Sequence, residues 1–360
     1  MPPRRSAWNL GSVAGIRLQM HWTFPLLLVW VVVLYVSEGA GVVATLQGVV
    51  LILTLFGCIV LHELGHALMA RREGIATRDI TLLPIGGVAR LDRMPDHPAG
   101  ELRVAAAGPA VTVGIAVLLY LALRVSGWYH LLDQTPVVGG NLLVLLFWAN
   151  VMILAFNLLP AFPMDGGRIL RALLSFRMER VHATAIAARL GQGMAVLFGV
   201  AGLLWNPFLI LIGIFVYFGA AAEAHEAQVR HQLEGVPVRA AMMTDLHVLA
   251  PDQSVDDAAE ALLASAHRAF PVTRDGHLVG LITRRDIVRQ RGKAHGGAAE
   301  VRTIMRRDPP VAREDDPLVD ALRDLEVHAD AALPVVRNGT LVGLLTTENV
   351  QEYLALGRES

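Results

Sequence analysis

Residues 39–61 carry no charged side chain, and this uninterrupted apolar stretch constrains the fold more than any other feature of the 360-residue chain. A transmembrane helix needs about 20 consecutive apolar residues, so the stretch is long enough to cross a bilayer. Every long uncharged run lies before residue 223, and the residues that follow are rich in charge. The sequence therefore predicts an α-helical polytopic membrane domain followed by a soluble part.

We expect about six transmembrane helices within residues 1–225. The segments that predict them are residues 18–36, 41–70, 104–123, one helix within 134–164, and two within 191–222 that Trp205-Asn206-Pro207 separates. The sixth helix should be short. An alternative for the first segment is a signal peptide, because Arg4 and Arg5 precede its apolar core and small residues follow it.

The distribution of arginine predicts the orientation of these helices. Arginines gather in the N-terminal tail and in the connections after the second and fourth helices, whereas residues 37–40, 126–139 and 205–207 contain no Lys or Arg. Cytoplasmic loops carry the excess of basic residues, so the N-terminus and the soluble part should both be cytosolic. We expect a multi-pass integral membrane protein of a prokaryotic plasma membrane.

The uncharged stretch is followed at once by His62-Glu63-Leu64-Gly65-His66. Two histidines four apart share one helix face and can bind one metal ion, and the Glu between them can take a proton from metal-bound water. Ionisable groups that face lipid are costly, whereas groups that face a protein interior and hold a cation are tolerable. His62 precedes Arg71 by nine residues, or roughly 13 Å of helix, so the metal should lie within the bilayer.

A third metal ligand is expected because catalytic zinc usually has three protein ligands and one open position. Asp165 directly follows an apolar segment that Pro160 and Pro163 end, and Gly166 and Gly167 then allow a tight turn. A carboxylate in this position needs a partner, and a metal would supply one. The alternative is an Asp that caps the helix beginning near residue 168.

Together these motifs resemble the site-2 protease family of intramembrane metalloproteases, and the resemblance covers most of residues 15–225. The resemblance implies an endopeptidase with one Zn²⁺, in which metal-activated water cleaves the transmembrane segments of membrane-tethered proteins. By motif match His62, His66 and Asp165 are the ligands and Glu63 is the base. Asn157, in Asn157-x-x-Pro160-x-x-Pro163-x-Asp165, is similar to the family's asparagine near the site and would donate to the oxyanion, with a helix C-cap as the alternative.

Residues 78–90 read as an extended segment, with a break at Pro84 and Gly86-Gly87. In the resembling family this region is a strand-rich loop near the site. A helical substrate must unwind before its amide reaches a metal, and an exposed strand edge could hold it extended. We expect Gly86 and Gly87 to allow close backbone approach to the substrate, with a plain turn as the alternative.

Residues 236–355 repeat at a spacing of 63, so that Leu278-Val279-Gly280-Leu281 aligns with Leu341-Val342-Gly343-Leu344. Each copy reads as helix, strand, turn, strand, helix, and the pair resembles a tandem CBS module of α+β fold. Such pairs often bind adenine nucleotides, which implies AMP or ATP near Thr283, Asp286 and Thr346. Asn349 replaces the second Asp, which puts a second ribose contact in doubt. A dimerisation platform that forms a homodimer is the alternative role.

The expected organisation is a membrane metalloprotease domain (1–225), a linker (226–235) and two CBS domains (236–290 and 301–355). The competing hypothesis is a CBS-regulated transporter or channel that uses the His, Glu and Asp cluster as a cation path. That hypothesis leaves the order His-Glu-x-x-His unexplained. A net charge of −1 gives no basic field for nucleic acid, and Cys58 as the single cysteine excludes a disulfide framework.

Overall fold

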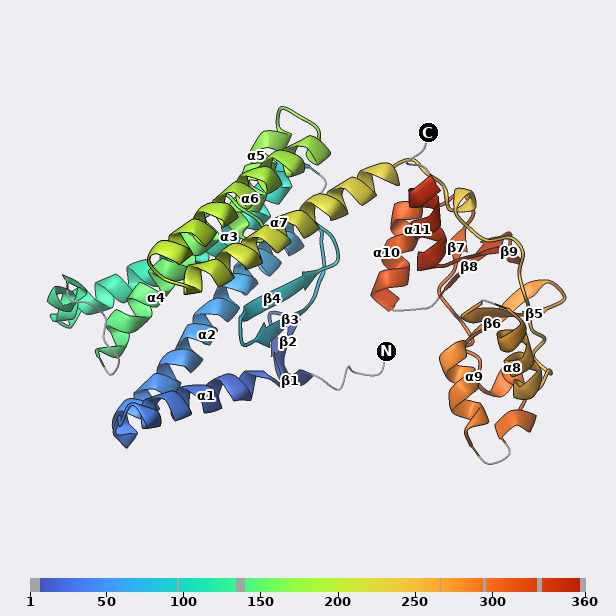
Figure 1. Cartoon of the computed structure of the whole chain (residues 1–360), viewed down its shortest axis with the longest axis horizontal. Coiled ribbons are helices and arrows are strands. Elements are labelled where there is room, and N and C mark those ends of the chain that lie inside the picture. The colour runs from blue at the N-terminus through green and yellow to red at the C-terminus, as the bar shows by residue number, and fades with distance from the viewer. Residues whose placement is uncertain are drawn as a thin grey trace. The chain divides into compact units, whose positions relative to one another are not determined.

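The structure, a computed structural model, describes residues 7–95, 97–133, 140–265, 267–293, 296–328 and 332–356. It divides into two compact units, Met1–Ala227 and Gln228–Ser360 (Figure 1). Arg4 and Arg5, which contributed to the predicted orientation, lie outside the described residues.

Helices make up most of the first unit. They are α1 (Phe24–Ser37), α2 (Val42–Arg72), α3 (Pro98–Val125), α4 (Leu142–Asn157), α5 (Asp165–Ser175), α6 (Arg180–Leu204) and α7 (Phe208–Gln232), with a 3-10 helix η1 (Trp128–Asp133) between α3 and α4. Among the described residues, α2, α3, α6 and α7 are long and apolar enough to cross a membrane, while α1 and α4 are shorter apolar helices.

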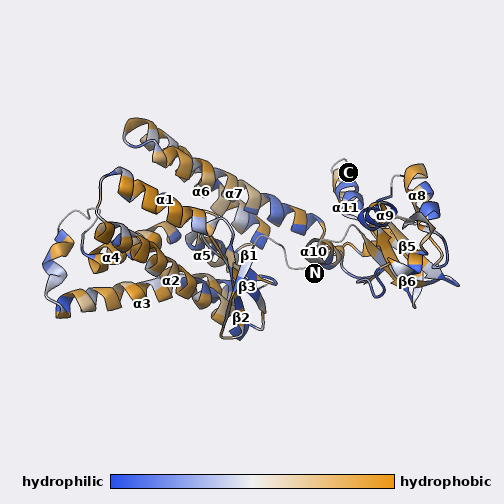
Figure 2. Ribbon diagram, turned by 90° about the horizontal axis from the view of Figure 1, so that it is seen from below, coloured by the Kyte–Doolittle hydropathy of each residue, from blue (hydrophilic) through white to orange (hydrophobic). Residues whose placement is uncertain are grey.

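The outward faces of the long helices require an apolar solvent. Only 17% to 33% of the residues in their most apolar windows are buried inside the protein. Figure 2 shows hydrophobic residues along most of α2 and α3 and hydrophilic residues toward the end of α7. A water-soluble protein does not expose apolar surface on this scale, and a bilayer accepts it because every helix satisfies its own backbone hydrogen bonds. The predicted helical membrane domain is therefore confirmed.

Several predicted spans have different boundaries in the structure, and α3 and α6 begin six and eleven residues earlier than expected, at Pro98 and Arg180. The first was expected over residues 18–36, but Leu18–His21 lie in a strand and α1 begins at Phe24. These four residues pair with a neighbouring strand, and Pro25 lies in the first turn of the helix, where its missing N–H costs nothing. The sixth was expected to be short, but α7 has 25 residues because the helix continues through its charged end.

A four-stranded sheet accompanies the helices, in the order β1 (Ala7–Val13), β2 (Ile16–His21), β3 (Thr77–Leu83), β4 (Gly86–Leu91). β3 and β4 form the expected strand-rich loop, and β2 pairs in parallel with β3. Ile16 and Ile80 pack beneath the sheet against Leu64 and Ala67 of α2. The sheet is therefore fixed to the same helix that carries the histidines, with β4 at its edge.

The second unit is the α+β module that the repeat predicts. Its sheet has the order β5 (Ala269–Arg274), β6 (His277–Thr283), β9 (Thr340–Leu345), β8 (Leu333–Arg337), β7 (Ala312–Arg313). The helices are α8 (Val255–Ala264), α9 (Arg284–Arg291), α10 (Leu318–His328) and α11 (Thr347–Leu356), and short 3-10 helices η2 (Val238–Ala240), η3 (Gly296–Ala298) and η4 (Val301–Thr303) connect them.

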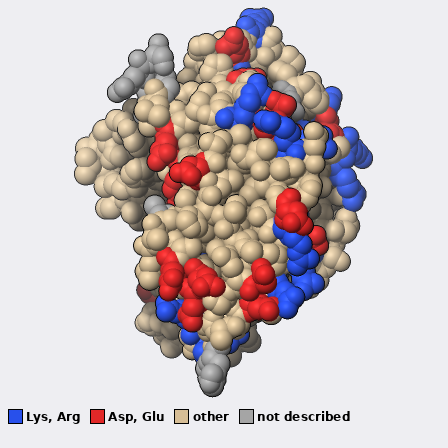
Figure 3. All heavy atoms as spheres, turned by 90° about the vertical axis from the view of Figure 1, so that its right-hand side faces the viewer, with Lys and Arg blue, Asp and Glu red and all other residues tan. Residues whose placement is uncertain are grey.

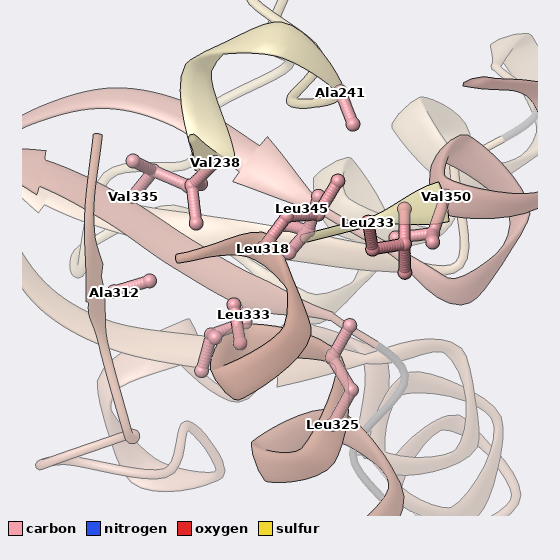
Figure 4. Close-up of a cluster of buried hydrophobic side chains, with 11 residues drawn as sticks. Leu233, Val238, Ala241, Ala312, Leu318, Leu325, Leu333, Val335, Leu345 and Val350 are labelled. Atoms are coloured by element: carbon pink, nitrogen blue, oxygen red, sulfur yellow. The ribbon is translucent and has the colours of Figure 1, made fainter. Parts of the chain in front are cut away.

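The two repeats exchange their leading segments. Met243 pairs with Leu344 of the second repeat, and Arg306 pairs with Leu281 of the first. The core shown in Figure 4 accordingly joins Val238, at the start of the first repeat, to Val335 and Leu345 of the second. Because each copy completes the core of the other, the module is one folding unit.

Charged side chains of both signs lie in neighbouring groups on the face shown in Figure 3. In the second unit Arg337 pairs with Glu314, and Arg239 pairs with Asp315. The Arg337 guanidinium holds the pKa of Glu314 below its ordinary value by donating hydrogen bonds to it. These pairs are exposed, so they contribute little stability each.

Candidate metal centre

Three buried side chains from two helices point donor atoms at one spot. His62 and His66 lie on α2, and Asp165 is the first residue of α5. The Nε2 atoms of the histidines are 3.1 Å apart, and each is 3.2 Å from Asp165 Oδ2. All three residues are buried, with 5%, 7% and 8% of their surface exposed.

The triangle of donor atoms fits a divalent cation such as zinc. Four-coordinate zinc with bonds of about 2.0–2.2 Å keeps its ligand atoms roughly 3.3–3.5 Å apart, close to the separations found here. Two imidazoles and one carboxylate are also the donor set of many catalytic zinc sites, which leave a fourth position open. The structure thus brings together the three predicted ligands in a geometry suited to the metal.

The other ring nitrogen of each histidine has a partner on α3. Nδ1 of His66 lies 2.8 Å from the Val104 carbonyl and Nδ1 of His62 lies 2.8 Å from Thr112 Oγ1. The Thr112 hydroxyl donates to the Gly108 carbonyl, so its oxygen is free to accept from His62. Both Nδ1 atoms therefore carry the proton, and both Nε2 lone pairs are directed at the metal position.

Glycines allow α3 to approach the histidines closely. A Cβ on Gly65 of α2 would lie 2.8 Å from the Ala107 carbonyl, and a Cβ on Gly108 would lie 2.6 Å from His62 Nε2 and still closer to His66 Nε2. A side chain at 108 would occupy the metal position itself. No sequence motif points to Val104, Gly108 or Thr112, because their roles depend on how α3 packs on α2.

Glu63 lies between the two histidines on α2 and is half-buried. Its Oε2 accepts a hydrogen bond of 3.2 Å from the backbone N–H of Ala89 in β4. A Cβ on Gly87 would lie 2.9 Å from Glu63 Cγ, so the backbone of β4 passes directly over this side chain. Gly86 differs: it has open space around it and a φ of +141°, which favours glycine.

The glycines after Asp165 have a different role from the one predicted. Neither Gly166 nor Gly167 has a positive φ; both lie in the first turn of α5 rather than in a tight turn. A Cβ on Gly166 would lie 2.5 Å from the Leu158 carbonyl, and one on Gly167 would lie 2.6 Å from the Ala161 carbonyl carbon. The two glycines let the start of α5 pack on the preceding loop, which brings Asp165 to the histidines.

Asn157 is the last residue of α4 and is half-buried. Within the described part of the chain, no hydrogen bond holds its side-chain amide. Its role at the centre stays a prediction.

In the CBS module, the predicted nucleotide residues form helix caps. Thr283 is the N-cap of α9, and its hydroxyl lies 2.6 Å from Asp286 Oδ2, which also accepts from the Thr283 N–H. Thr346 has the same arrangement with Asn349, whose Oδ1 accepts from the Thr346 hydroxyl at 2.8 Å and from its N–H at 3.2 Å. Asn349 therefore preserves the cap that Asp286 makes in the first copy.

Comparison with known proteins finds relatives of both units. Residues 50–200 match peptidase family M50, and residues 238–293 and 301–356 match the CBS domain. Zinc metalloprotease MJ0392 of Methanocaldococcus jannaschii is 35% identical over 349 residues, which cover 97% of this chain and 96% of that protein. Stage IV sporulation protein FB of Bacillus subtilis is 28% identical over 51% of this chain and 60% of its own length. The solved site-2 protease from Methanocaldococcus jannaschii is 40% identical, covers 61% of this chain and 95% of that chain, and has a TM-score of 0.46.

Replacing Gly108 by Ala should abolish metal binding, because the added methyl group would fill the metal position. We expect Zn²⁺ affinity to fall by more than about 100-fold, beyond the 10–100-fold typical when an outer partner of a ligand is lost. The measurement is Zn²⁺ content and competition with a chelator in purified protein. Gly114→Ala on the same helix is the matched control, since no atom lies within 4 Å of its Cβ. Equal zinc affinity in the two variants would contradict the assigned metal position.

Proposed function

Since the chain belongs to peptidase family M50, the site-2 protease family of zinc metalloproteases, we propose that it cleaves transmembrane segments of membrane-tethered proteins. The donor triangle of His62, His66 and Asp165, buried among apolar helices, is the observation that supports this proposal. A hydrolytic centre enclosed by apolar helices is suited to substrates that are themselves in the membrane. The family assignment leaves no role for the competing transporter hypothesis.

His62, His66 and Asp165 would hold the zinc ion. Zinc bound there would act as a Lewis acid that lowers the pKa of a water molecule and polarises the scissile carbonyl. Glu63, adjacent to His62 and held by the Ala89 N–H, accepts the proton of the attacking water and later returns it to the leaving amine. Asn157 is proposed as a donor to the oxyanion of the tetrahedral intermediate.

We propose that the substrate binds in extended form beside β4. β4 is the last strand of its sheet, so one of its edges is unpaired among the described strands, and β-strand addition at such an edge exposes a substrate amide. The Ala89 N–H to Glu63 hydrogen bond fixes this strand at the catalytic base. Substrate backbone that pairs with β4 would thereby lie next to Glu63. Gly87 permits this approach, and the φ of Gly86 shapes the hairpin that leads into it.

The proposed orientation places the N-terminus and the CBS pair in the cytosol of a prokaryotic cell, with the protein in the plasma membrane. α2 ends with Arg71 and Arg72 in its last turn, on the side where the positive-inside rule expects cytosol. His66 lies five residues before Arg71, or roughly 7 Å of helix, so the centre would be nearer the cytosolic face.

The CBS pair is proposed to bind AMP or ATP and to regulate cleavage. Thr283 and Asp286 stand together at the start of α9, where a ribose could exchange for their mutual hydrogen bond. Dimerisation is the second candidate role, supported by exposed apolar side chains on α8 and α9: Leu263 is 81% exposed and Val288 is 59% exposed. A second copy of the chain would bury these side chains in a homodimer.

Glu63→Gln should abolish proteolysis and spare metal binding. The amide cannot accept the proton of the attacking water, so we expect the rate to fall about 10²–10⁴-fold. The measurement is cleavage of single-span membrane proteins co-expressed with the enzyme, with zinc content determined on the same preparation. His62→Ala, which removes a metal ligand, is the contrasting variant. Cleavage by Glu63→Gln at the wild-type rate would refute the assigned base.

Gly87→Ala should reduce cleavage by up to about 100-fold, because the methyl group would displace β4 from Glu63 and a displacement of about 1 Å can cost that much. Zinc affinity should not change, since Gly87 contacts no ligand. The control is Val88→Ala on the adjacent residue, which is 45% exposed. If Gly87→Ala cleaves a model substrate as fast as the wild type, close approach of β4 is not needed for catalysis.

Asp286→Asn should weaken AMP or ATP binding by about 10–100-fold, the value of a hydrogen bond to a charged group. The fold should be preserved, because Asn349 already makes the equivalent cap in the second repeat. Titration calorimetry on the full-length protein measures affinity, and thermal unfolding checks the cap. Wild-type protein that binds neither nucleotide at millimolar concentration would favour the dimerisation role instead.

A further inference from the structure

One face of α3 carries the groups that hold both histidines, and the same face also contacts α5, the helix of the third ligand. Glu101, Val104, Gly108 and Thr112 are spaced by three, four and four residues, so they lie on the same side of the helix. Val104 and Thr112 accept hydrogen bonds from His66 and His62, as described above. Glu101, one turn before Val104, instead contacts α5, the helix that begins with Asp165.

The contact between Glu101 and α5 is made by Arg171. Arg171 Nε and Nη2 lie 2.7 Å and 2.6 Å from Glu101 Oε1. Arg171 is six residues after Asp165 on the same helix, and its guanidinium lies over the Phe162 ring, 5.0 Å from the ring centroid. Phe162 belongs to the loop that leads into Asp165. Arg171 thus joins α3 to both sides of the third ligand.

Two more charged residues hold this pair in place. Arg171 Nη1 lies 2.5 Å from Glu223 Oε1 on α7, and Arg180 Nη2, at the start of α6, lies 3.2 Å from Glu101 Oε2. The four side chains carry two positive and two negative charges, so the cluster is neutral. Its contacts hold Arg171 in one orientation from two directions.

Stability alone does not account for such a cluster. Glu101 is 1% exposed and Arg171 is 4% exposed. Removing two charges from water offsets most of their attraction, and replacing a buried pair by apolar side chains is often neutral or stabilising. What a buried, forked ion pair supplies is a fixed geometry between two helices. Here that geometry relates α5 to the helix that positions both imidazoles.

We propose that Arg171 and Glu101 are positioning residues that set Asp165 in register with His62 and His66. The inference rests on the proposed role of Asp165 as the third ligand. Without the pair, α5 would still pack on α3, but Asp165 Oδ2 would lose its fixed distance to the two Nε2 atoms. Metal affinity is therefore the property that the pair controls.

Arg171→Lys tests this proposal. Lysine keeps the positive charge but lacks the planar group whose Nε and Nη2 contact Glu101 while Nη1 contacts Glu223 and which lies over the Phe162 ring. We expect Co²⁺ affinity, measured on the full-length protein against a competing chelator, to fall about 10–100-fold, as when an outer partner of a metal ligand is lost. The visible spectrum of bound Co²⁺, which reports coordination geometry, should also change.

Two variants serve as controls. Arg103→Lys alters a different ion pair of α3, in which Arg103 Nε lies 2.8 Å from Glu73 Oε1. Arg177→Lys alters an exposed arginine just after α5. Both should bind Co²⁺ like the wild type. A purely structural role would lower the unfolding temperature of the metal-free protein and leave the affinity of folded Arg171→Lys unchanged, which would overturn the proposal.

Glu101→Gln is the second test and does not depend on Arg171→Lys being folded. It keeps the shape of the side chain and removes the charge that Arg171 binds, so it should weaken Co²⁺ binding in the same direction. The double variant, Arg171→Lys with Glu101→Gln, should lose no more Co²⁺ affinity than the losses of the two single variants added together, because both changes remove the same contact. Wild-type affinity in Glu101→Gln would also overturn the proposal. Absence of proteolysis in the wild type would count against the proposed function, while the Co²⁺ affinities would still decide the positioning role.

Discussion

The structure of the membrane unit depends on bringing two imidazole nitrogens and one carboxylate oxygen within 3.2 Å of one another in an apolar interior. Two Nε2 lone pairs and a carboxylate oxygen this close together repel one another unless a proton or a metal cation lies between them. The surrounding contacts all serve this convergence. Gly65 and Gly108 bring α3 against α2, the Val104 carbonyl and Thr112 hydroxyl orient the rings, and Gly166 and Gly167 let α5 deliver the carboxylate. The metal centre is therefore a property of helix packing as much as of the motif.

The sequence was sufficient to predict which three side chains converge, because a motif fixes them locally, but it could not identify what orients them. His62 and His66 share one helix turn, and Asp165 follows a recognisable Pro and Gly pattern. Gly108 and Thr112 belong to an ordinary apolar span, and only three-dimensional packing gives them a role. The same limit explains why the boundaries of several predicted spans differ. Leu18–Met20 adjoin an apolar run but pair with β3, and the charged end of α7 remains helical because Glu, Gln, Ala and Arg favour a helix in water.

The repeat of 63 residues predicted the CBS module closely, and the structure adds why the aligned positions differ so little. Met242 and Met305 align, as do Gly280 and Gly343, and each methionine packs across the module on the other repeat's glycine. A Cβ on Gly280 would lie 2.7 Å from Met305 Sδ, and one on Gly343 would lie 2.6 Å from Met242 Sδ. A substitution at one of these positions would therefore disturb the packing of the other repeat. Asn349 is tolerated because its amide oxygen replaces the carboxylate of Asp286 in the cap.

α7 is continuous from Phe208 to Gln232, and Leu233 directly after it is fully buried in a core of the second unit. Glu223, on the same helix, pairs with Arg171 of α5. Ten residues, or about 15 Å of helix, separate these two anchors. One continuous helix thus carries a residue of the charged cluster that contacts α5 and leads directly into a residue of the hydrophobic core of the repeats.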